Sequence, residues 1–308
     1  MTEDSEKRSI LVTSALPYAN APLHLGHILE HIQTDIWVRY QRLIGNDVVY
    51  VCADDAHGTP IMLKADELNM TPEELIAEIY ESHTSVFKKF NISHDNYHST
   101  HSEENEFLSR KIFLALQDKG LIEKKEIDQL YDTSKEMFLS DRYVKGICPS
   151  CGADDQYGDN CEKCSATYNA IELKNPVSVL SNTAPIVRKS EHLFFKLSVL
   201  KEEISSWLDD SFVQSSVRNK LNEWLNDDLK DWDISRDSPY FGFKIPGYED
   251  KYFYVWLDAP IGYLASHLNH LKKNKRENLF HEFWDPQSNS EIYHFIGKDI
   301  MYFHALFF

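Results

Sequence analysis

The sequence predicts an α/β domain with a parallel sheet, interrupted by an inserted segment that carries a four-cysteine metal knuckle. Three observations lead to this prediction. The first 55 residues show a strand, a loop, a helix and a second strand, and such a βαβ unit makes its two strands parallel. Near Gly120 the pattern changes to short apolar stretches, turns and a cysteine cluster. The α/β pattern returns after residue 250, which favours one interrupted domain over two α/β domains in succession.

The first βαβ unit follows from local signals. A β-branched apolar run over residues 9–14 predicts a buried strand, and two prolines within residues 16–22 predict a loop after it. Apolar residues at helical spacing predict a helix over residues 25–43, which Gly45 ends. A second apolar run, residues 47–53, predicts the next buried strand. The residues that show the helical spacing are Ile28, Leu29, Ile32, Ile36, Trp37 and Val38.

Further along, Thr71 is expected to cap a helix, with Pro72 in its first turn and Glu74 reaching back to the cap. Residues 102–120 predict another helix. The apolar face of the helix after Thr71 is expected to contain Leu75, Ile79, Val86 and Phe90. After the cysteine-containing segment we expect helix over residues 199–230 and strands over residues 251–257 and 292–297.

Composition excludes several classes of protein. The 308 residues carry 32 Lys and Arg against 49 Asp and Glu, a net charge of −17. This charge repels a phosphate backbone, so we expect no DNA partner. The sequence contains no 18-residue apolar run and starts with a polar tail, which predicts neither a membrane span nor a secretory signal. We therefore expect a cytoplasmic protein with no membrane partner.

The basic run over residues 272–276 is typical of a solvated helix face.

Four of the five cysteines form two CxxC pairs separated by nine residues: Cys148, Cys151, Cys161 and Cys164. Two such pairs can hold four thiolates around one ion, and Zn²⁺ is the usual occupant. Because all four ligands would be sulfur, we expect one structural Zn²⁺ per chain rather than a catalytic metal. The alternative is four free thiols or two disulfides. Cys52 stands apart on an apolar strand and is expected to be a core residue.

The segment His24-Leu25-Gly26-His27 lies between the proline loop and the first helix. Unpaired N–H groups at a helix start suit phosphate, and two imidazoles three residues apart can donate to phosphate oxygens. One alternative is that both histidines only cap the helix. A second is that His27, Glu30 and His31 form the H-x-x-E-H pattern of a zinc peptidase. His94, His98 and His101 also resemble a metal cluster, but we expect a polar loop there.

Polar or aromatic groups follow the predicted strands, where parallel sheets bind ligands. Asp55 ends the second strand and could hold an ammonium group or cap a helix. The stretch from Trp256 to Tyr263 could line an apolar pocket or belong to the core. Asp299 follows the last strand and could accept hydrogen bonds from ribose hydroxyls.

Together these stretches resemble the methionyl-tRNA synthetase family of class I aminoacyl-tRNA synthetases. Leu16-Pro-Tyr18-Ala-Asn20 followed by His24-Leu-Gly-His27 resembles the first class I signature. The resemblance extends from about Ile10 to the end of the sequence, in six stretches that occur in the family's order. The others are Cys52–Pro60, the four cysteines with Asp155–Asp159, Trp232–Arg236, Trp256–Tyr263 and His294–Ile300.

The resemblance implies a Rossmann-type catalytic domain split by a connective-peptide domain with a zinc knuckle. The expected divisions are a polar tail over residues 1–9, catalytic segments over 10–118 and 251–308, and the connective-peptide domain over 119–250 with its knuckle at 145–168. It also implies a methionine–tRNA ligase with methionine, ATP and tRNA(Met) as partners. Methionine and ATP with Mg²⁺ would give methionyl-adenylate and pyrophosphate, and the methionyl group would then pass to the tRNA.

The resemblance also assigns roles to individual residues. His24 and His27 would be catalytic and would bind ATP together with Gly26, Gly297 and Asp299. Asp55 would hold the ammonium group of methionine. The remaining residues of the methionine pocket would be Leu16, Tyr18, Trp232, Trp256, Ala259, Pro260, Tyr263, Ile300, Phe303 and His304.

The family's second signature, Lys-Met-Ser-Lys-Ser, is absent from the sequence, as is a helical anticodon-binding domain. We expect this chain to be a fragment that binds methionine but activates it weakly or not at all. We also expect the complete enzyme to activate homocysteine and to need editing, because one methyl group in an apolar pocket discriminates by only about 10–200-fold. The alternative functions are a HxGH nucleotidylyltransferase, a zinc-knuckle RNA-binding protein and a tRNA-binding paralogue without catalysis.

Overall fold

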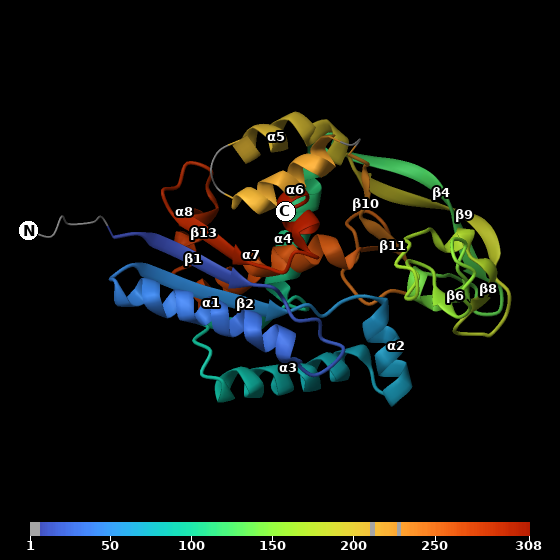
Figure 1. The fold of residues 1–308 in the computed structure, drawn as a ribbon, viewed down its shortest axis with the longest axis horizontal. Helices are drawn as coiled ribbons and strands as arrows, with labels where there is room; N and C mark the ends of the chain where they lie inside the picture. The colour runs from blue at the N-terminus through green and yellow to red at the C-terminus, as the bar shows by residue number, and fades with distance from the viewer. Residues whose placement is uncertain (1–6, 210–212, 227–228) are drawn as a thin grey trace, which may run out of the picture. The chain divides into compact units, whose positions relative to one another are not determined.

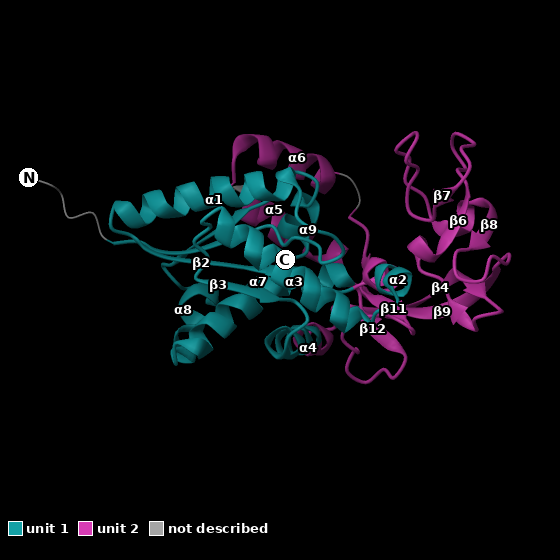
Figure 2. Ribbon diagram, turned by 90° about the horizontal axis from the view of Figure 1, so that it is seen from below, with its two compact units in different colours: residues 1–57, 64–113, 255–308 teal, residues 58–63, 114–254 magenta. Residues whose placement is uncertain are grey.

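The computed structural model describes residues 7–209, 213–226 and 229–308 and divides the chain into two compact units. The first unit contains the segments up to residue 57, 64–113 and 255–308, drawn in teal in Figure 2. The second contains residues 58–63 and 114–254, in magenta. Parts of the expected polar tail and of the expected 199–230 helix lie outside the described residues. The domain boundaries drawn from the family resemblance stay a prediction.

The first unit is built on a four-stranded sheet in the order β13-β1-β2-β3, and each neighbouring pair is parallel. The register places Ser14 at the end of β1 opposite Phe295 at the end of β13. Figure 1 shows β13, from the end of the chain, beside β1. This pairing confirms one interrupted α/β domain and rules out two in succession. The strands are β1 (Ser9–Ser14), β2 (Asp47–Asp54), β3 (Asn96–Ser99) and β13 (Glu291–Phe295).

The helices of the first unit cover both faces of this sheet. Val38 of α1 packs with Ile10, Val12 and Tyr50 on one face. On the other, Tyr263 of α7 lies with its ring 5.3 Å from that of His294. The helices are α1 (Leu25–Leu43), α3 (Pro72–Lys89), α7 (Val255–Lys273), α8 (His281–Trp284) and α9 (Met301–Leu306); α2 (Thr59–Leu68) and α4 (Glu103–Asp118) cross the division between the units.

Helix α1 has the predicted bounds, but its buried face is more polar than the apolar spacing suggests. Leu29 and Ile36 are 57% and 63% exposed. The buried residues are Ile28, His31, Thr34, Asp35, Val38 and Gln41. Asp35 can be buried because it accepts hydrogen bonds from the N–H and hydroxyl groups of Ser93. A buried polar group is tolerated when a partner is supplied, and that partner comes from a distant segment.

Helix α3 confirms the predicted cap, in which Thr71 and Glu74 exchange hydrogen bonds between side chain and backbone. Its predicted apolar face is partly wrong, because Phe90 at the C-cap is 49% exposed. The buried residues are Leu75, Ile76, His83 and Phe87. His83 replaces an apolar residue on this face since its ring binds Asp54 and the carbonyl of Ala21.

Two element predictions are wrong. The apolar run over residues 251–257 is a strand only at β12 (Lys251–Phe253), and α7 begins at Val255. A short apolar run fits a buried strand or a buried helix equally well, so the period alone could not decide. The histidine-rich segment expected to be a loop contains β3, whose pairing with Val51–Asp54 of β2 completes the sheet.

The second unit is mainly antiparallel. A long ladder joins β4 (Ile122–Asp132) to β9 (Ile186–Phe195), in a sheet of order β10-β9-β4-β5. A three-stranded sheet, β7-β6-β8, carries the cysteine knuckle. The other elements are β5 (Met137–Phe138), β6 (Val144–Ile147), β7 (Gln156–Tyr157), β8 (Lys174–Ser178), α5 (Lys201–Asp209), α6 (Ser215–Asn226), β10 (Trp232–Asp233), β11 (Ser235–Asp237) and β12.

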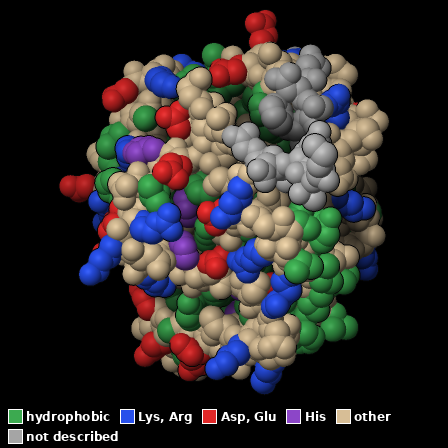
Figure 3. Space-filling model, turned by 90° about the vertical axis from the view of Figure 1, so that its left-hand side faces the viewer, with side chains coloured by type: hydrophobic (Ala, Val, Ile, Leu, Met, Phe, Trp, Pro, Cys, Tyr) green, Lys and Arg blue, Asp and Glu red, His purple; other side chains and the backbone are tan. Residues whose placement is uncertain are grey.

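Across the described ranges, every helix is too short or too polar to cross a membrane. The face shown in Figure 3 intersperses Lys and Arg with Asp and Glu.

Candidate active site

The predicted site residues of the first unit follow the carboxyl ends of neighbouring strands. The loop after β1 pairs with the end of β2, since Asp55 donates its N–H to the carbonyl of Pro17 and Ala19 donates to the carbonyl of Asp55. Gly297 and Asp299 follow β13, which lies on the other side of β1. The sheet register therefore places three loops at one edge, where parallel sheets bind ligands.

His24 and His27 cap helix α1 reciprocally. Nδ1 of His24 accepts from the N–H of Gly26, and Nδ1 of His27 accepts from the N–H of His24. Their rings stack with centroids 3.8 Å apart. An imidazole whose Nδ1 accepts must carry its proton on Nε2 when neutral. Burial and the neighbouring His24 also lower the pKa of His27, which favours this neutral form. The cap thus leaves one Nε2–H donor on each ring at a helix start.

Gly26 is required by this arrangement. A Cβ atom at residue 26 would lie 2.8 Å from Cε1 of His24, inside the ring's contact distance. Any larger residue would therefore displace His24. The structure thus shows that both histidines cap the helix, and their role toward phosphate stays a prediction.

The Asp55 carboxylate accepts a hydrogen bond from the backbone N–H of His57, but one of its oxygens is left without a partner among the described residues. This oxygen, Oδ1, is buried. Burial, followed by the negative charges of Asp258 and Asp54, raises the pKa of Asp55 well above its usual value. A buried carboxylate oxygen without a partner is costly, and a cationic ligand would remove that cost.

Helices α7 and α9 bring together the aromatic residues expected in a pocket. The rings of Trp256 and Phe303 stack with centroids 4.1 Å apart. Nδ1 of His304 lies 3.0 Å from the carbonyl oxygen of Ile300, so it must donate there. Nε2 of His304 is then an acceptor, and the hydroxyl of Tyr263 donates to it at 2.8 Å. Burial lowers the pKa of His304 and keeps this pair neutral.

The small residues on α7 let neighbouring segments approach. Ala259 and Pro260 are buried within the helix. A Cβ at Gly262 would lie 2.7 Å from Thr100 and 3.3 Å from Leu16, so Leu16 packs directly on the α7 backbone. Tyr18 donates its hydroxyl to the carbonyl of His57.

Glu30, which the sequence indicated only as part of the peptidase pattern, lies close to this site. It accepts from the N–H of Ala15 at 2.8 Å. Burial, reinforced by the charge of Asp299, raises the pKa of Glu30 to about 7. The Asp299 carboxylate in turn lies against Gly297, where a Cβ would meet Oδ1 at 2.4 Å. The loop after β13 and the second turn of α1 are therefore electrostatically coupled.

Sequence reasoning missed two hydrogen-bonded groups of titratable residues, one centred on His57 and one on Asp54. Nδ1 of His57 binds Oδ2 of the buried Asp258, and Nε2 of His57 lies 3.0 Å from Nδ1 of His101. Asp54 binds His83 and the hydroxyl of Tyr97. The available signal was the carboxylate of Asp258 within an apolar run.

Trp232 lies in the second unit, on β10, with its ring 6.2 Å from that of Tyr254. A buried ion network holds this strand. His192 lies between Asp233 and Asp237, with nitrogen–oxygen distances of 2.7 and 3.0 Å. The family's pocket role for Trp232 stays a prediction.

The four knuckle cysteines converge within residues 145–168. Their sulfur atoms lie within 4.8 Å of one another, with Cys148 and Cys164 3.9 Å apart and Cys151 and Cys161 3.6 Å apart. Tetrahedral coordination at a Zn–S distance of about 2.3 Å gives sulfur–sulfur distances of about 3.8 Å. None of the four is joined in a disulfide. The group fits Zn²⁺.

Serine at Cys161 is expected to remove this metal and to unfold the knuckle, because three thiolates hold Zn²⁺ less well and metal binding contributes to folding. Metal content measured by elemental analysis should fall by one equivalent per chain relative to wild type, and the melting temperature should fall with it. The control is Glu162→Gln, at an exposed residue between the two cysteines of the second pair. It should alter neither the metal content nor the melting temperature. An unchanged melting temperature in a metal-free C161S chain would contradict a structural role.

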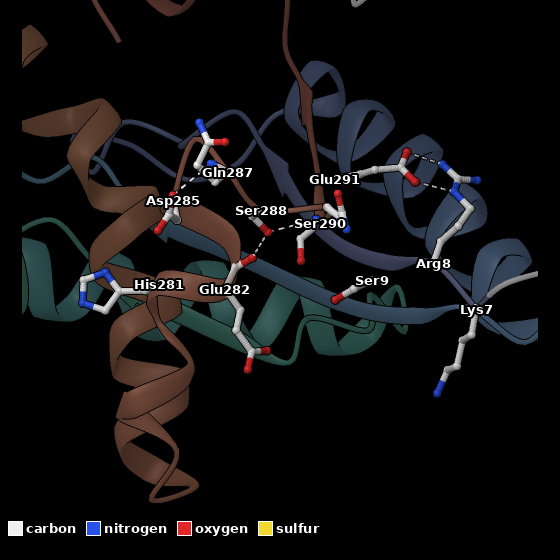
Figure 4. Close-up of a pocket in the computed structure, with 11 residues that line it drawn as sticks. Lys7, Arg8, Ser9, His281, Glu282, Asp285, Gln287, Ser288, Ser290 and Glu291 are labelled. Atoms are coloured by element: carbon white, nitrogen blue, oxygen red, sulfur yellow. Dashed lines mark hydrogen bonds and ion pairs between the residues drawn. The ribbon is translucent and has the colours of Figure 1, made fainter.

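A separate open groove of about 840 Å³ lies at the opposite end of the sheet (Figure 4). It is lined by residues that begin β1 and β13, including Ser9 and Glu291, and by polar residues of the segment before β13. Arg8 there is paired with Glu291. Parallel sheets bind ligands at their carboxyl ends, so we do not assign the groove to the site.

The peptidase pattern is not a metal site. His27 caps the helix start, whereas His31 points inward to Ser14 and His94. The three histidines of residues 94–101 also diverge, since His98 binds Glu104 and His101 meets His57.

Comparison with known families agrees with this geometry. The family model described as "tRNA synthetases class I (M)" matches residues 10–308. The chain belongs to the class I (M) tRNA synthetases. This family assignment confirms the resemblance seen in the sequence and excludes the nucleotidylyltransferase alternative.

Solved structures support the same fold for this synthetase chain. Methionyl-tRNA synthetase of Mycobacterium tuberculosis in complex with methionyl-adenylate matches with a TM-score of 0.72 and 22% identity over 97% of this chain. A second structure of that enzyme, bound by methionyl-adenylate, matches with a TM-score of 0.71 and 23% identity over 97%. The synthetase chain spans 53% and 54% of those proteins.

Proposed function

We propose that the chain forms the catalytic part of a methionine–tRNA ligase, which activates methionine with ATP and transfers it to tRNA(Met). The observation that carries the proposal is the combination of two features. Asp55 has an unpartnered carboxylate oxygen, and the loop that pairs with it at Tyr18 runs on to the capped start of α1. One feature suits an ammonium group and the other suits phosphate. An amino acid and a nucleotide would thus be held at one edge of one sheet.

On the nucleotide side, His24 and His27 would donate from Nε2–H to the phosphates of ATP, and Mg²⁺ would accompany the nucleotide. Gly26 keeps the backbone N–H groups close to the ligand, while Gly297 and Asp299 would face the adenosine. The methionine carboxylate attacks the α-phosphorus, the bond to the β-phosphate oxygen breaks, and pyrophosphate leaves. Such a reaction needs alignment and stabilisation of the leaving phosphates more than covalent help.

On the amino-acid side, Asp55 would bind the ammonium group. Trp256, Phe303 and the Tyr263–His304 pair would surround the side chain; the other proposed pocket residues are Leu16, Tyr18, Trp232, Ala259, Pro260 and Ile300. A polarizable thioether packs well against aromatic rings. In the second step a ribose hydroxyl at the tRNA end attacks the activated carbonyl, and AMP leaves. We also propose that the knuckle holds one structural Zn²⁺.

A thermal-shift panel tests the substrate directly. Methionine, homocysteine, leucine, isoleucine and valine are each added alone, and a ligand at about 100 times its Kd should stabilise the chain by roughly 2.7 kcal/mol. We expect a clear shift with methionine, a smaller one with homocysteine and none with the branched side chains. A larger shift with leucine than with methionine would overturn the assignment of methionine. Weak activation by the isolated chain stays a prediction.

A further inference from the structure

A second cluster of soft metal ligands lies in the first unit, within the core. His31 of α1, Cys52 of β2 and His94 of the segment before β3 each place one ligand atom within 4.8 Å of the other two. His31 and Cys52 are fully buried, and His94 is partly buried. The sequence showed His94 only as part of a different histidine group and Cys52 only as a core residue.

The distances suit one ion. Nδ1 of His31 lies 3.2 Å from Nε2 of His94. Two imidazole nitrogens on one tetrahedral Zn²⁺ are about 3.3 Å apart, given Zn–N distances of about 2.05 Å. A thiolate on the same ion would lie about 3.6 Å from each nitrogen, and the sulfur of Cys52 lies within 4.8 Å of a ring nitrogen of each histidine. The hydroxyl of Ser14, 3.2 Å from Nδ1 of His31, supplies a fourth donor.

The cluster lies among the apolar side chains of the first unit. The ring centroid of Phe87 lies 4.3 Å from that of His31 and 5.1 Å from that of His94, so the surroundings of the two histidines are apolar.

We propose that His31, Cys52 and His94 form a second metal site, distinct from the knuckle, which takes a cation that prefers nitrogen and sulfur ligands, such as Zn²⁺. Two imidazoles and one thiolate select such ions over Mg²⁺ or Ca²⁺. Binding replaces the proton of the Cys52 thiol, which is released to solvent. The ion would join α1, which begins at the capping histidines, to β2, which ends at Asp54. Loading would therefore stabilise the sheet edge that carries the candidate active site.

The test exploits the cysteine count. A variant with serine at all four knuckle positions retains Cys52 as its one cysteine out of five. Co²⁺ is titrated into this variant and into the metal-free wild-type chain. We expect two equivalents in wild type and one in the four-serine variant, whose near-ultraviolet thiolate-to-cobalt absorption corresponds to one thiolate instead of four. The melting temperature of the variant should rise on loading.

His94→Phe keeps a ring beside Phe87 and removes the ligand nitrogen. In the four-serine background it should lose the thiolate band, whereas His281→Phe, on an exposed histidine, should keep it. Absence of any thiolate band in the four-serine variant would overturn the site. Persistence of the band in the H94F form would overturn the assignment of His94. Metal binding is measured without amino acid or ATP, so neither result depends on the proposed ligase activity.

Discussion

Replacing Asp55 by asparagine is expected to weaken methionine binding strongly while making the ligand-free chain more stable. The two effects have one cause, the buried oxygen without a partner. Removing the charged partner of a bound ammonium group costs 2–5 kcal/mol, so the Kd for methionine should rise by at least about 30-fold. Removing the charge of a buried carboxylate with one unpartnered oxygen should stabilise the free chain by about 1 kcal/mol. Calorimetric titration and thermal unfolding measure the two quantities.

The stability gain of D55N has a defined pH dependence. Because the folded state raises the pKa of Asp55, the native chain holds this proton more tightly than the unfolded chain does. The free energy of unfolding of the wild type therefore falls as the pH rises above about 3.9, the pKa of Asp55 in the unfolded chain. The asparagine variant has no such group, so its free energy of unfolding does not fall for this reason. The difference in melting temperature should be largest near neutral pH and vanish toward pH 4.

Asp47→Asn is the matched control, since Asp47 is an exposed carboxylate at the opposite end of the same strand. It should leave the Kd for methionine unchanged and the melting temperature nearly so. If D55N lowered the melting temperature and left methionine binding intact, Asp55 would be a structural residue and the ammonium site would lie elsewhere.

Replacing His24 is expected to separate the capping role of the histidine from its role toward phosphate. Asparagine is a good N-cap and can accept from the Gly26 N–H, but it lacks the distant Nε2–H donor. Alanine lacks both. If methionyl-adenylate formation is the activity, as proposed above, we expect both variants to form it about 10²–10³ times more slowly than the unsubstituted protein, because a donor to the transition state is lost. Alanine alone should also cost about 1 kcal/mol of stability.

The measurement is the ATP–pyrophosphate exchange rate at saturating methionine, together with the melting temperature of each variant. His281→Asn, on an exposed histidine of α8, controls for loss of an imidazole as such. Wild-type exchange by H24N would show that His24 serves only as a cap. Equal loss of stability in H24N and H24A would show that the asparagine does not restore the cap. The role toward phosphate would then have to be tested by substitution of His27.

The sequence by itself determined those features whose cause is local. The first βαβ unit, the bounds of α1 and the Thr71–Glu74 cap depend on residues within one or two turns of each other. The knuckle is equally local, because each CxxC pair forms its own turn and the pairs are nine residues apart. The motif around His24 could be recognised for the same reason.

The tertiary structure decided everything that depends on a distant partner. Asp35 and His83 could be buried only because Ser93 and Asp54 supply their hydrogen bonds. The run from Val255 is a helix because it packs on β2 and β3, where Ser266 binds the carbonyl of Cys52.

Distant segments also decide that Oδ1 of Asp55 has no partner, and they bring His31, Cys52 and His94 together. Periodicity specifies how a segment turns, but the free energy of burying a polar group is set by the atoms that other segments bring to it. That information enters only when the chain is folded.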